Sequence, residues 1–138
     1  MLRQMRINND LNSLREMSTW LATNCRWLGL PEALSFRLDL AANEAVANTI
    51  SYGYATGVRG EIALTLGTVE DHAVLEIEDD GLPFNPLALA DAPPAQSLEE
   101  SRIGGLGVSL IRRNMALCDY QRRAGRNVLT LKSPISGD

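Results

Sequence analysis

The sequence predicts an α/β two-layer sandwich, an α+β arrangement in which helices cover a mostly antiparallel, mixed sheet. Apolar residues recur at spacings of three and four between residues 11 and 45, which is typical of amphipathic helices. Two strand patterns joined by a short turn occupy residues 61–79, which indicates an antiparallel hairpin. A second pair of short strands is expected at 119–123 and 128–131, around Gly125. The 138 residues fit a single domain, residues 1–138.

The first half of the chain carries two predicted helices, preceded by a weak strand candidate at residues 2–8. The first helix is indicated by an apolar series that ends near Gly29, a suitable C-cap: Leu11, Leu14, Met17, Leu21, Cys25 and Leu28. Pro31 suits the first turn of the second helix, and no Gly or Pro interrupts the run from Glu32 to Tyr52. One apolar stripe of that run should face the core: Leu34, Leu38, Ala41 and Ala45.

Two polar residues on the second helix lie beside this stripe. Glu44 and Asn48 are four residues apart, so their side chains are neighbours on the helix surface. Polar groups at the edge of a core need a partner, because an unpaired buried polar group is costly. Two interpretations stay open: a surface pair next to the core, or a site in which Asn48 holds a hard cation and Glu44 accepts a proton.

The second strand of the hairpin, His72 to Asp79, ends in a further polar anomaly. Its alternation places Asp79 on the same face as Leu75 and Ile77, so the carboxylate should point toward the core side of the sheet. The chain then leaves the strand through Asp80 and Gly81. On local grounds Asp79 is equally suited to capping this turn.

A long loop of small and polar residues, 85–103, follows. Loops of this length inside a compact domain are often lids or binding loops. It leads into Gly104-Gly105-Leu106-Gly107 at a predicted helix start, where free backbone N–H groups can hold a phosphate. Arg102 is the nearest cation for a terminal phosphate. The alternative interpretation of the glycine-rich segment is an ordinary loop end, and that of Arg102 is an exposed arginine without a ligand. The inner face of the helix that follows should carry Val108, Ile111, Met115 and Cys118.

Composition excludes several function classes. Aromatic residues make up only 5% and the formal net charge is −4, which argues against a nucleic-acid-binding surface. No apolar run is long enough to span a bilayer and no leader pattern is present, so we expect a cytoplasmic protein without membrane contact. The two cysteines fit core positions of helices, and His72 has no metal-binding motif around it.

In their order and separation, these motifs resemble the GHKL ATP-binding superfamily and, within it, the small anti-sigma-factor serine kinases. Glu44 to Asn48, continuing to Gly53 and Tyr54, is similar to the N-box of the family. Asp79-Asp80-Gly81 is similar to the first glycine box, and Gly104-Gly105-Leu106-Gly107 to the second. The segment from Gly125 to Leu131 resembles the closing strand, so the resemblance extends over essentially the whole chain.

Three positions depart from the family pattern. Tyr52-Gly53-Tyr54 stands where the family has His-Gly-Tyr, and Pro83 replaces the second Gly of the first glycine box. Gly125-Arg126 takes the place of the Gly-Thr pair in the closing strand. The last two departures bear on the details of the adenine site and the lid.

The resemblance implies a Bergerat-type fold that binds ATP and Mg²⁺. It implies Glu44 as general base, Asn48 as the magnesium ligand, and Asp79 as acceptor of a hydrogen bond from the adenine amino group. Gly81 belongs to the same box as Asp79, and phosphate binding falls to Arg102, Gly104, Gly105, Leu106 and Gly107. The implied reaction is phosphorylation of a serine of a STAS-type anti-sigma-factor antagonist, with a sigma factor as second partner and a homodimer as the assembly. A non-catalytic ATP-binding partner-switching module and an output domain of a phosphorelay are the alternatives.

Overall fold

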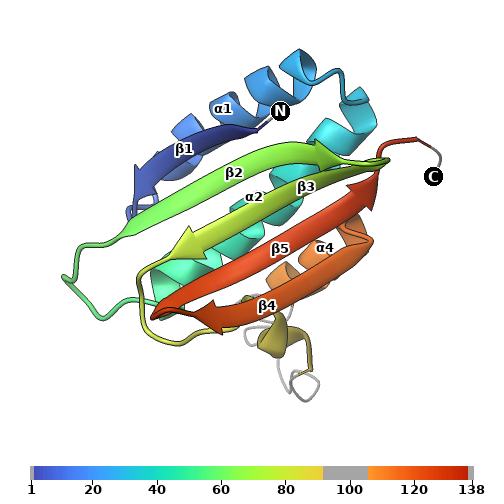
Figure 1. Ribbon diagram of the computed structural model, residues 1–138. Coiled ribbons are helices and arrows are strands. Elements are labelled where there is room, and N and C mark those ends of the chain that lie inside the picture. The colour runs from blue at the N-terminus through green and yellow to red at the C-terminus, as the bar shows by residue number, and fades with distance from the viewer. Residues whose placement is uncertain (1, 92–105, 137–138) are drawn as a thin grey trace.

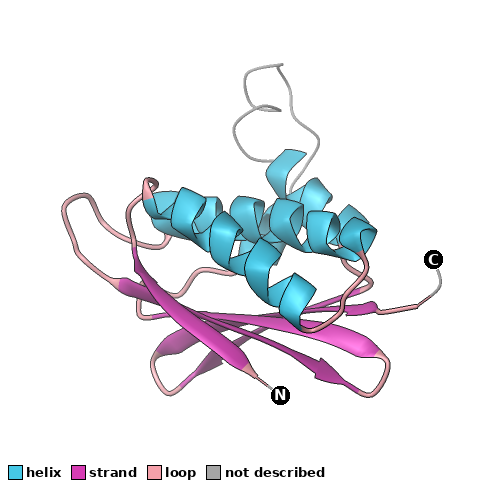
Figure 2. Ribbon diagram, turned by 90° about the horizontal axis from the view of Figure 1, so that it is seen from above, coloured by secondary structure: helices cyan, strands magenta, loops and turns pink. Residues whose placement is uncertain are grey.

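The computed structural model describes residues 2–91 and 106–136. The elements are β1 (Arg3–Asn8), α1 (Ser13–Trp27), α2 (Glu32–Tyr52), β2 (Glu61–Val69), β3 (His72–Asp79), the 3-10 helix η1 (Pro86–Asp91), α4 (Leu106–Asn114), β4 (Leu117–Arg123) and β5 (Arg126–Pro134). They form two layers, with one five-stranded sheet and the helices packed on one of its faces (Figures 1 and 2). This is the predicted two-layer sandwich.

The strand order in the sheet is β1-β2-β3-β5-β4, which makes β3 the central strand. The four pairings between the described strands are all antiparallel, which confirms the mostly antiparallel character that the sequence predicts but shows no parallel pair of the expected mixed sheet. At the end of β3, Asp79 lies opposite Ile62 of β2 on one side and opposite Asn127 of β5 on the other. The last residue of the central strand is therefore flanked by both neighbouring strands.

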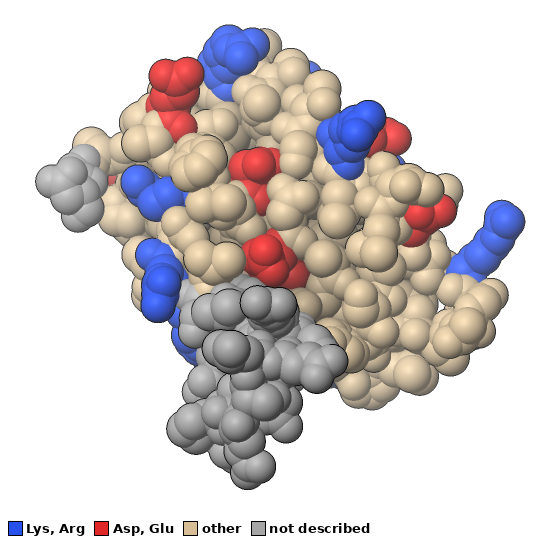
Figure 3. All heavy atoms as spheres, turned by 180° about the vertical axis from the view of Figure 1, so that it is seen from behind, with Lys and Arg blue, Asp and Glu red and all other residues tan. Residues whose placement is uncertain are grey.

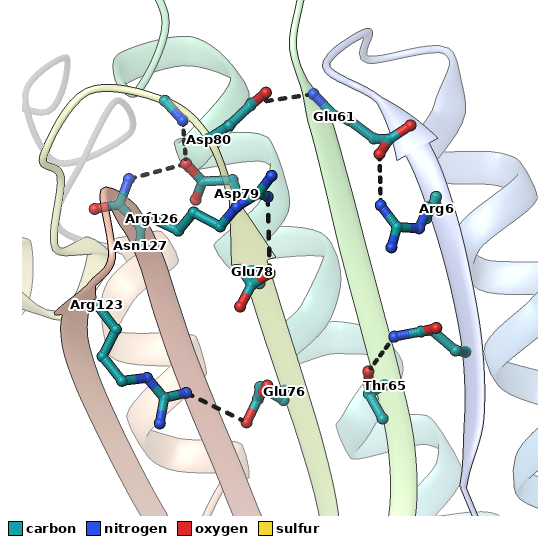
Figure 4. A network of polar contacts seen from close by, with 12 residues as sticks. Arg6, Glu61, Thr65, Glu76, Glu78, Asp79, Asp80, Arg123, Arg126 and Asn127 are labelled. Atoms are coloured by element: carbon teal, nitrogen blue, oxygen red, sulfur yellow. Dashed lines mark hydrogen bonds and ion pairs between the residues drawn. The ribbon is translucent and has the colours of Figure 1, made fainter.

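The core lies between the sheet and the helices. The predicted stripe of α2 is buried, and so are the inward residues of the central strands: Leu34, Leu38, Ala41, Ala45, Ile62, Leu64, Leu66, Leu75 and Ile77. The opposite face of the sheet carries ion pairs, among them Arg6–Glu61, Arg123–Glu76 and Arg126–Glu78 (Figure 4). Because these pairs are partly or largely exposed, they keep this face polar but add little to stability.

Two predicted helix boundaries are wrong. Helix α1 begins at Ser13, and Leu11 lies before it, 54% exposed. Helix α4 ends at Asn114, so Cys118 is not on its inner face but in β4, opposite Leu131. Directly after the helix, the Ala116 amide donates to the Ser133 hydroxyl at 3.1 Å, and pairing with β5 then draws the chain into the sheet. A long-range strand partner thus overrides the local helical spacing.

The two C-terminal strands are longer than the sequence indicates and are joined by a tight turn. Ala124 and Gly125 both have positive φ angles, of 50° and 76°. Two successive positive φ angles are typical of the two-residue turns whose twist matches a hairpin.

Among the described helices, none is long and apolar enough to serve as a membrane span.

We predict that Leu38→Ala lowers the free energy of unfolding by about 2–5 kcal/mol, because it empties a fully buried site between α2 and the sheet. Urea unfolding followed by circular dichroism measures the change. Phe36→Ala, two residues earlier on the same helix, is the control. Phe36 is 64% exposed, and we expect a change below about 0.5 kcal/mol there. Similar losses in both variants would contradict the assigned buried face of α2.

Candidate active site

Asn48 is the first sign of a site on α2. Its side chain is only 9% exposed, and its amide nitrogen Nδ2 is buried without a hydrogen-bond partner among the described residues. Leaving such a donor unpaired costs about 1–3 kcal/mol, which a bound ligand can recover. Asn48 is therefore not part of a surface pair. Glu44, one turn earlier, is partly exposed and shares the same side of the helix.

The amide of Asn48 suits a hard cation. Half a turn about its last side-chain bond exchanges the nitrogen and the oxygen, so the carbonyl oxygen can take the buried position. The described residues contain no group of three or more His, Cys, Asp or Glu side chains able to hold a metal. A cation at Asn48 would take its other ligands from phosphate and water, as Mg²⁺ commonly does.

Asp79 is the second polar group of the site and lies 3% exposed at the end of β3. Its Oδ1 accepts hydrogen bonds from the Gly81 amide and from Asn127 Nδ2, both at 2.8 Å (Figure 4). Burial raises the pKa of this carboxyl above its ordinary value, while the two hydrogen bonds oppose the shift. Both interpretations of Asp79 hold, since it points to the core side and also caps the turn.

A close contact joins this turn to the end of α2. The Leu82 amide donates to the Gly53 carbonyl at 2.8 Å. A Cβ atom on Gly81 would lie 2.4 Å from the same carbonyl oxygen, so only glycine permits this approach. Tyr52 and Phe84 extend the contact, with ring centroids 5.9 Å apart. The first two predicted motifs therefore meet in space.

Asp80 has a different role from its neighbour. It is largely exposed, and its Oδ1 accepts from the Tyr54 hydroxyl at 2.7 Å and from the Glu61 amide at 3.1 Å. Burial works against the charged form, but these hydrogen bonds outweigh it and hold the pKa of Asp80 below its ordinary value. Asp80 thus fastens the loop after α2 to the start of β2, and Asp79 alone faces the helical layer.

The third motif is described only in part. Leu106 and Gly107 open α4, which packs against α2. The remaining predicted phosphate-binding residues, Arg102, Gly104 and Gly105, lie outside the described residues. Figure 3 shows the helical face, where acidic side chains lie both near the middle and toward the margins, with basic side chains between and around them.

Three residues near Asp79 were missed by the sequence interpretation: Asn127, Tyr120 and Arg122. Asn127 donates to Asp79 and accepts from the Tyr120 hydroxyl and from Arg122 Nη1. A signal for Asn127 exists in the alternation of β5, because Asn127, Leu129 and Leu131 share the core face. Nothing in the sequence around Tyr120 or Arg122 indicates this contact.

We predict opposite pH dependences for Asp79→Asn and Asp80→Asn. A raised pKa means that the contribution of Asp79 to stability is present below its ordinary pKa of 3.8 and is lost as pH rises through the folded pKa. Asp79→Asn stays neutral and its Oδ1 can still accept both hydrogen bonds. Its free energy of unfolding should therefore increase relative to wild type as pH rises above that value.

Asp80 has the reverse sign. Its lowered pKa contributes stability above the ordinary value of 3.8, which is lost as pH falls through the folded pKa. Asp80→Asn should therefore lose stability relative to wild type as pH rises. Urea unfolding between pH 3 and pH 7 measures both differences (a range set by the ordinary carboxyl pKa). Differences that do not vary with pH in either variant would contradict the two environments.

Known proteins match this chain in sequence and in fold. The family model described as "Histidine kinase-like ATPase domain" matches residues 7–133. The serine/threonine-protein kinase BtrW of Bordetella bronchiseptica is 37% identical over 113 residues, which are 82% of this chain and 78% of that protein. The serine-protein kinase RsbW of Oceanobacillus iheyensis is 33% identical over 82 residues, which are 56% of this chain and 52% of that protein.

Solved structures agree on the fold. One describes the RsbU and RsbW domains of Rv1364c from Mycobacterium tuberculosis, with a TM-score of 0.68 and 18% identity over 99% of this chain and 33% of that chain. The catalytic domain of the histidine kinase ThkA gives a TM-score of 0.58 and 16% identity, over 99% of both chains. At 18% and 16% identity, these two similarities show that the fold is shared and nothing more. The match over residues 7–133 confirms the resemblance carried by the motifs, and the chain belongs to the histidine kinase-like ATPase domain family.

Proposed function

We propose that this protein is an ATP-dependent serine/threonine protein kinase of the anti-sigma-factor type. The observation that carries the proposal is the buried amide of Asn48, which has no hydrogen-bond partner in the described part of the chain and stands next to Glu44 on a helix whose end contacts the turn after Asp79. Similarity to BtrW over 82% of the chain supports protein phosphorylation. Family membership supports ATP as the phosphoryl donor.

In this proposal each residue has a defined task toward ATP. Asp79 accepts a hydrogen bond from the amino group of the adenine base through the oxygen that Gly81 and Asn127 leave free. Asn48 provides an amide oxygen for Mg²⁺. When bound, that ion neutralises charge on the phosphates. Phosphate binding falls to Arg102 and to the backbone N–H groups of Gly104, Gly105, Leu106 and Gly107.

Glu44 acts on the phosphoryl acceptor. Its carboxylate is partly exposed, so an incoming serine hydroxyl can reach it. It accepts the hydroxyl proton while the oxygen attacks the terminal phosphorus of ATP, and ADP leaves. The acceptor is a serine of a STAS-type anti-sigma-factor antagonist. We propose a sigma factor as a second partner and a homodimer as the assembly, as the resemblance to the family implies.

We predict that Asn48→Ala weakens Mg²⁺-dependent ATP binding by about tenfold or more in calorimetric titration, since a ligand to the cation is lost. Without nucleotide its free energy of unfolding should stay within about 1 kcal/mol of wild type, because Nδ2 makes no hydrogen bond to any of the described residues. Asn43→Ala is the matched control on α2, where the amide donates to Ser18 and Asp39. Unchanged ATP affinity in Asn48→Ala would contradict the assigned magnesium ligand.

We predict that Glu44→Gln slows phosphoryl transfer by about 10²–10⁴-fold while ATP binding persists, because only the proton acceptor is removed. Transfer of labelled phosphate from ATP to a STAS-type partner protein measures the rate. Glu32→Gln, at the exposed start of the same helix, should leave it unchanged. Wild-type protein that binds ATP and the partner without any transfer would favour the non-catalytic partner-switching module.

A further inference from the structure

We infer that Asn127 on β5 is a positioning residue, which fixes the orientation of the Asp79 carboxylate and thereby makes the site selective for a base with an exocyclic amino group. The inference rests on the proposed function, because it concerns the nucleotide that the site takes. It assigns the selectivity to a residue of the C-terminal hairpin, 48 residues after Asp79 in the sequence.

The amide nitrogen of Asn127 connects the carboxylate to the turn that follows it. The side chain is 3% exposed, and Nδ2 donates to Asp79 Oδ1 and to the Leu82 carbonyl, both at 2.8 Å. Figure 4 shows Asn127 and Asp79 on adjacent strands, with the amide directed at the carboxylate. Since the Gly81 amide donates to the same oxygen, Oδ1 is occupied by two donors. The described residues offer no hydrogen bond to Oδ2, which leaves that oxygen for a ligand.

The amide oxygen of Asn127 is held as firmly as its nitrogen. It accepts from the Phe84 amide at 3.2 Å, from the Tyr120 hydroxyl and from Arg122 Nη1 at 3.1 Å. Arg122 also donates to the Gly81 carbonyl at 2.9 Å, so it ties β4 to the same turn. If the amide were flipped, its nitrogen would face these three donors, and its oxygen would face two acceptors, Asp79 Oδ1 and the Leu82 carbonyl. The network therefore permits one orientation of Asn127 and, through it, one orientation of Asp79.

This orientation has a chemical consequence for the bound base. An ionised carboxylate oxygen only accepts hydrogen bonds, so Oδ2 favours a base that presents an N–H donor. A base with a carbonyl at the same position would bring its oxygen against Asp79 Oδ2. Two acceptors would then face each other in a buried place, where unpaired polar groups are strongly disfavoured. If Asp79 could rotate freely, the Gly81 amide and the base would compete for either oxygen and the discrimination would weaken.

The test is calorimetric titration of the whole chain with Mg·ATP and with Mg·ITP, which carries a carbonyl where ATP has its amino group. The variants are Asn127→Ala and the milder Tyr120→Phe, which removes only the hydroxyl that donates to Asn127. We expect ATP affinity to fall about tenfold in Asn127→Ala and about threefold in Tyr120→Phe. ITP affinity should change by less than about twofold, so the ATP-to-ITP preference declines.

Tyr54→Phe is the matched control, because it removes a hydroxyl that donates to the neighbouring carboxylate, Asp80. It should keep the wild-type preference for ATP. Thermal unfolding establishes which variants are folded, and Tyr120→Phe decides the question if Asn127→Ala does not fold. Folded variants that lose ATP and ITP affinity equally, or that lose neither, overturn the positioning role.

The wild-type titrations separate this inference from the proposed function. Wild-type protein that binds ATP and ITP equally tightly overturns the selectivity inference and leaves ATP binding intact. Wild-type protein that is folded and binds neither nucleotide overturns the proposed function, and the inference with it.

Discussion

The close approach between the turn after β3 and the end of α2 is the constraint on which the site depends. The Leu82 amide reaches the Gly53 carbonyl, and Gly81 has no side chain to prevent it. This contact holds the end of the strand that carries Asp79 against the end of the helix that carries Asn48, across the two layers. The arrangement uses a backbone hydrogen bond, which side-chain substitutions elsewhere leave in place, to bring two short polar motifs into one site.

Two adjacent aspartates at this junction, Asp79 and Asp80, have different roles because strand alternation directs their side chains to opposite faces of the sheet. Asp79 points into the layer of helices, where burial raises its pKa, and Asp80 points outward, where donors from Tyr54 and Glu61 lower its pKa. The pair occupies consecutive positions, so the pleat of the strand alone separates them. Asp80 connects the surrounding loops through its hydrogen bonds to Tyr54 and Glu61. Asp79 takes no part in these contacts and can face a ligand.

Local patterns in the sequence predicted most of the fold and the positions of Asn48 and Asp79 at the edge of the core. Period-three-and-four spacing located the buried face of α2, and strict alternation placed Asp79 correctly. Cys118 was assigned wrongly because its helical spacing continues past Asn114, while pairing with β5 decides its structure. The alternation of β5 places Asn127 on the core face, but its contact with Asp79 was missed because it arises from a strand register across 48 residues, which no local pattern encodes.

The strand order also determines when this protein can become competent during its synthesis. β1 must wait for β2, whose Thr65 lies 61 residues beyond the Gln4 that it contacts. Helices α1 and α2 are thus made before β2 to β5, the strands that complete the sheet under their apolar faces, which gives the nascent chain a period of exposed hydrophobic surface. β3 in turn gains its second neighbour only when β5 leaves the ribosome. In the proposed function, nucleotide recognition would therefore be among the last properties to appear, because the contact between Asp79 and Asn127 requires β5.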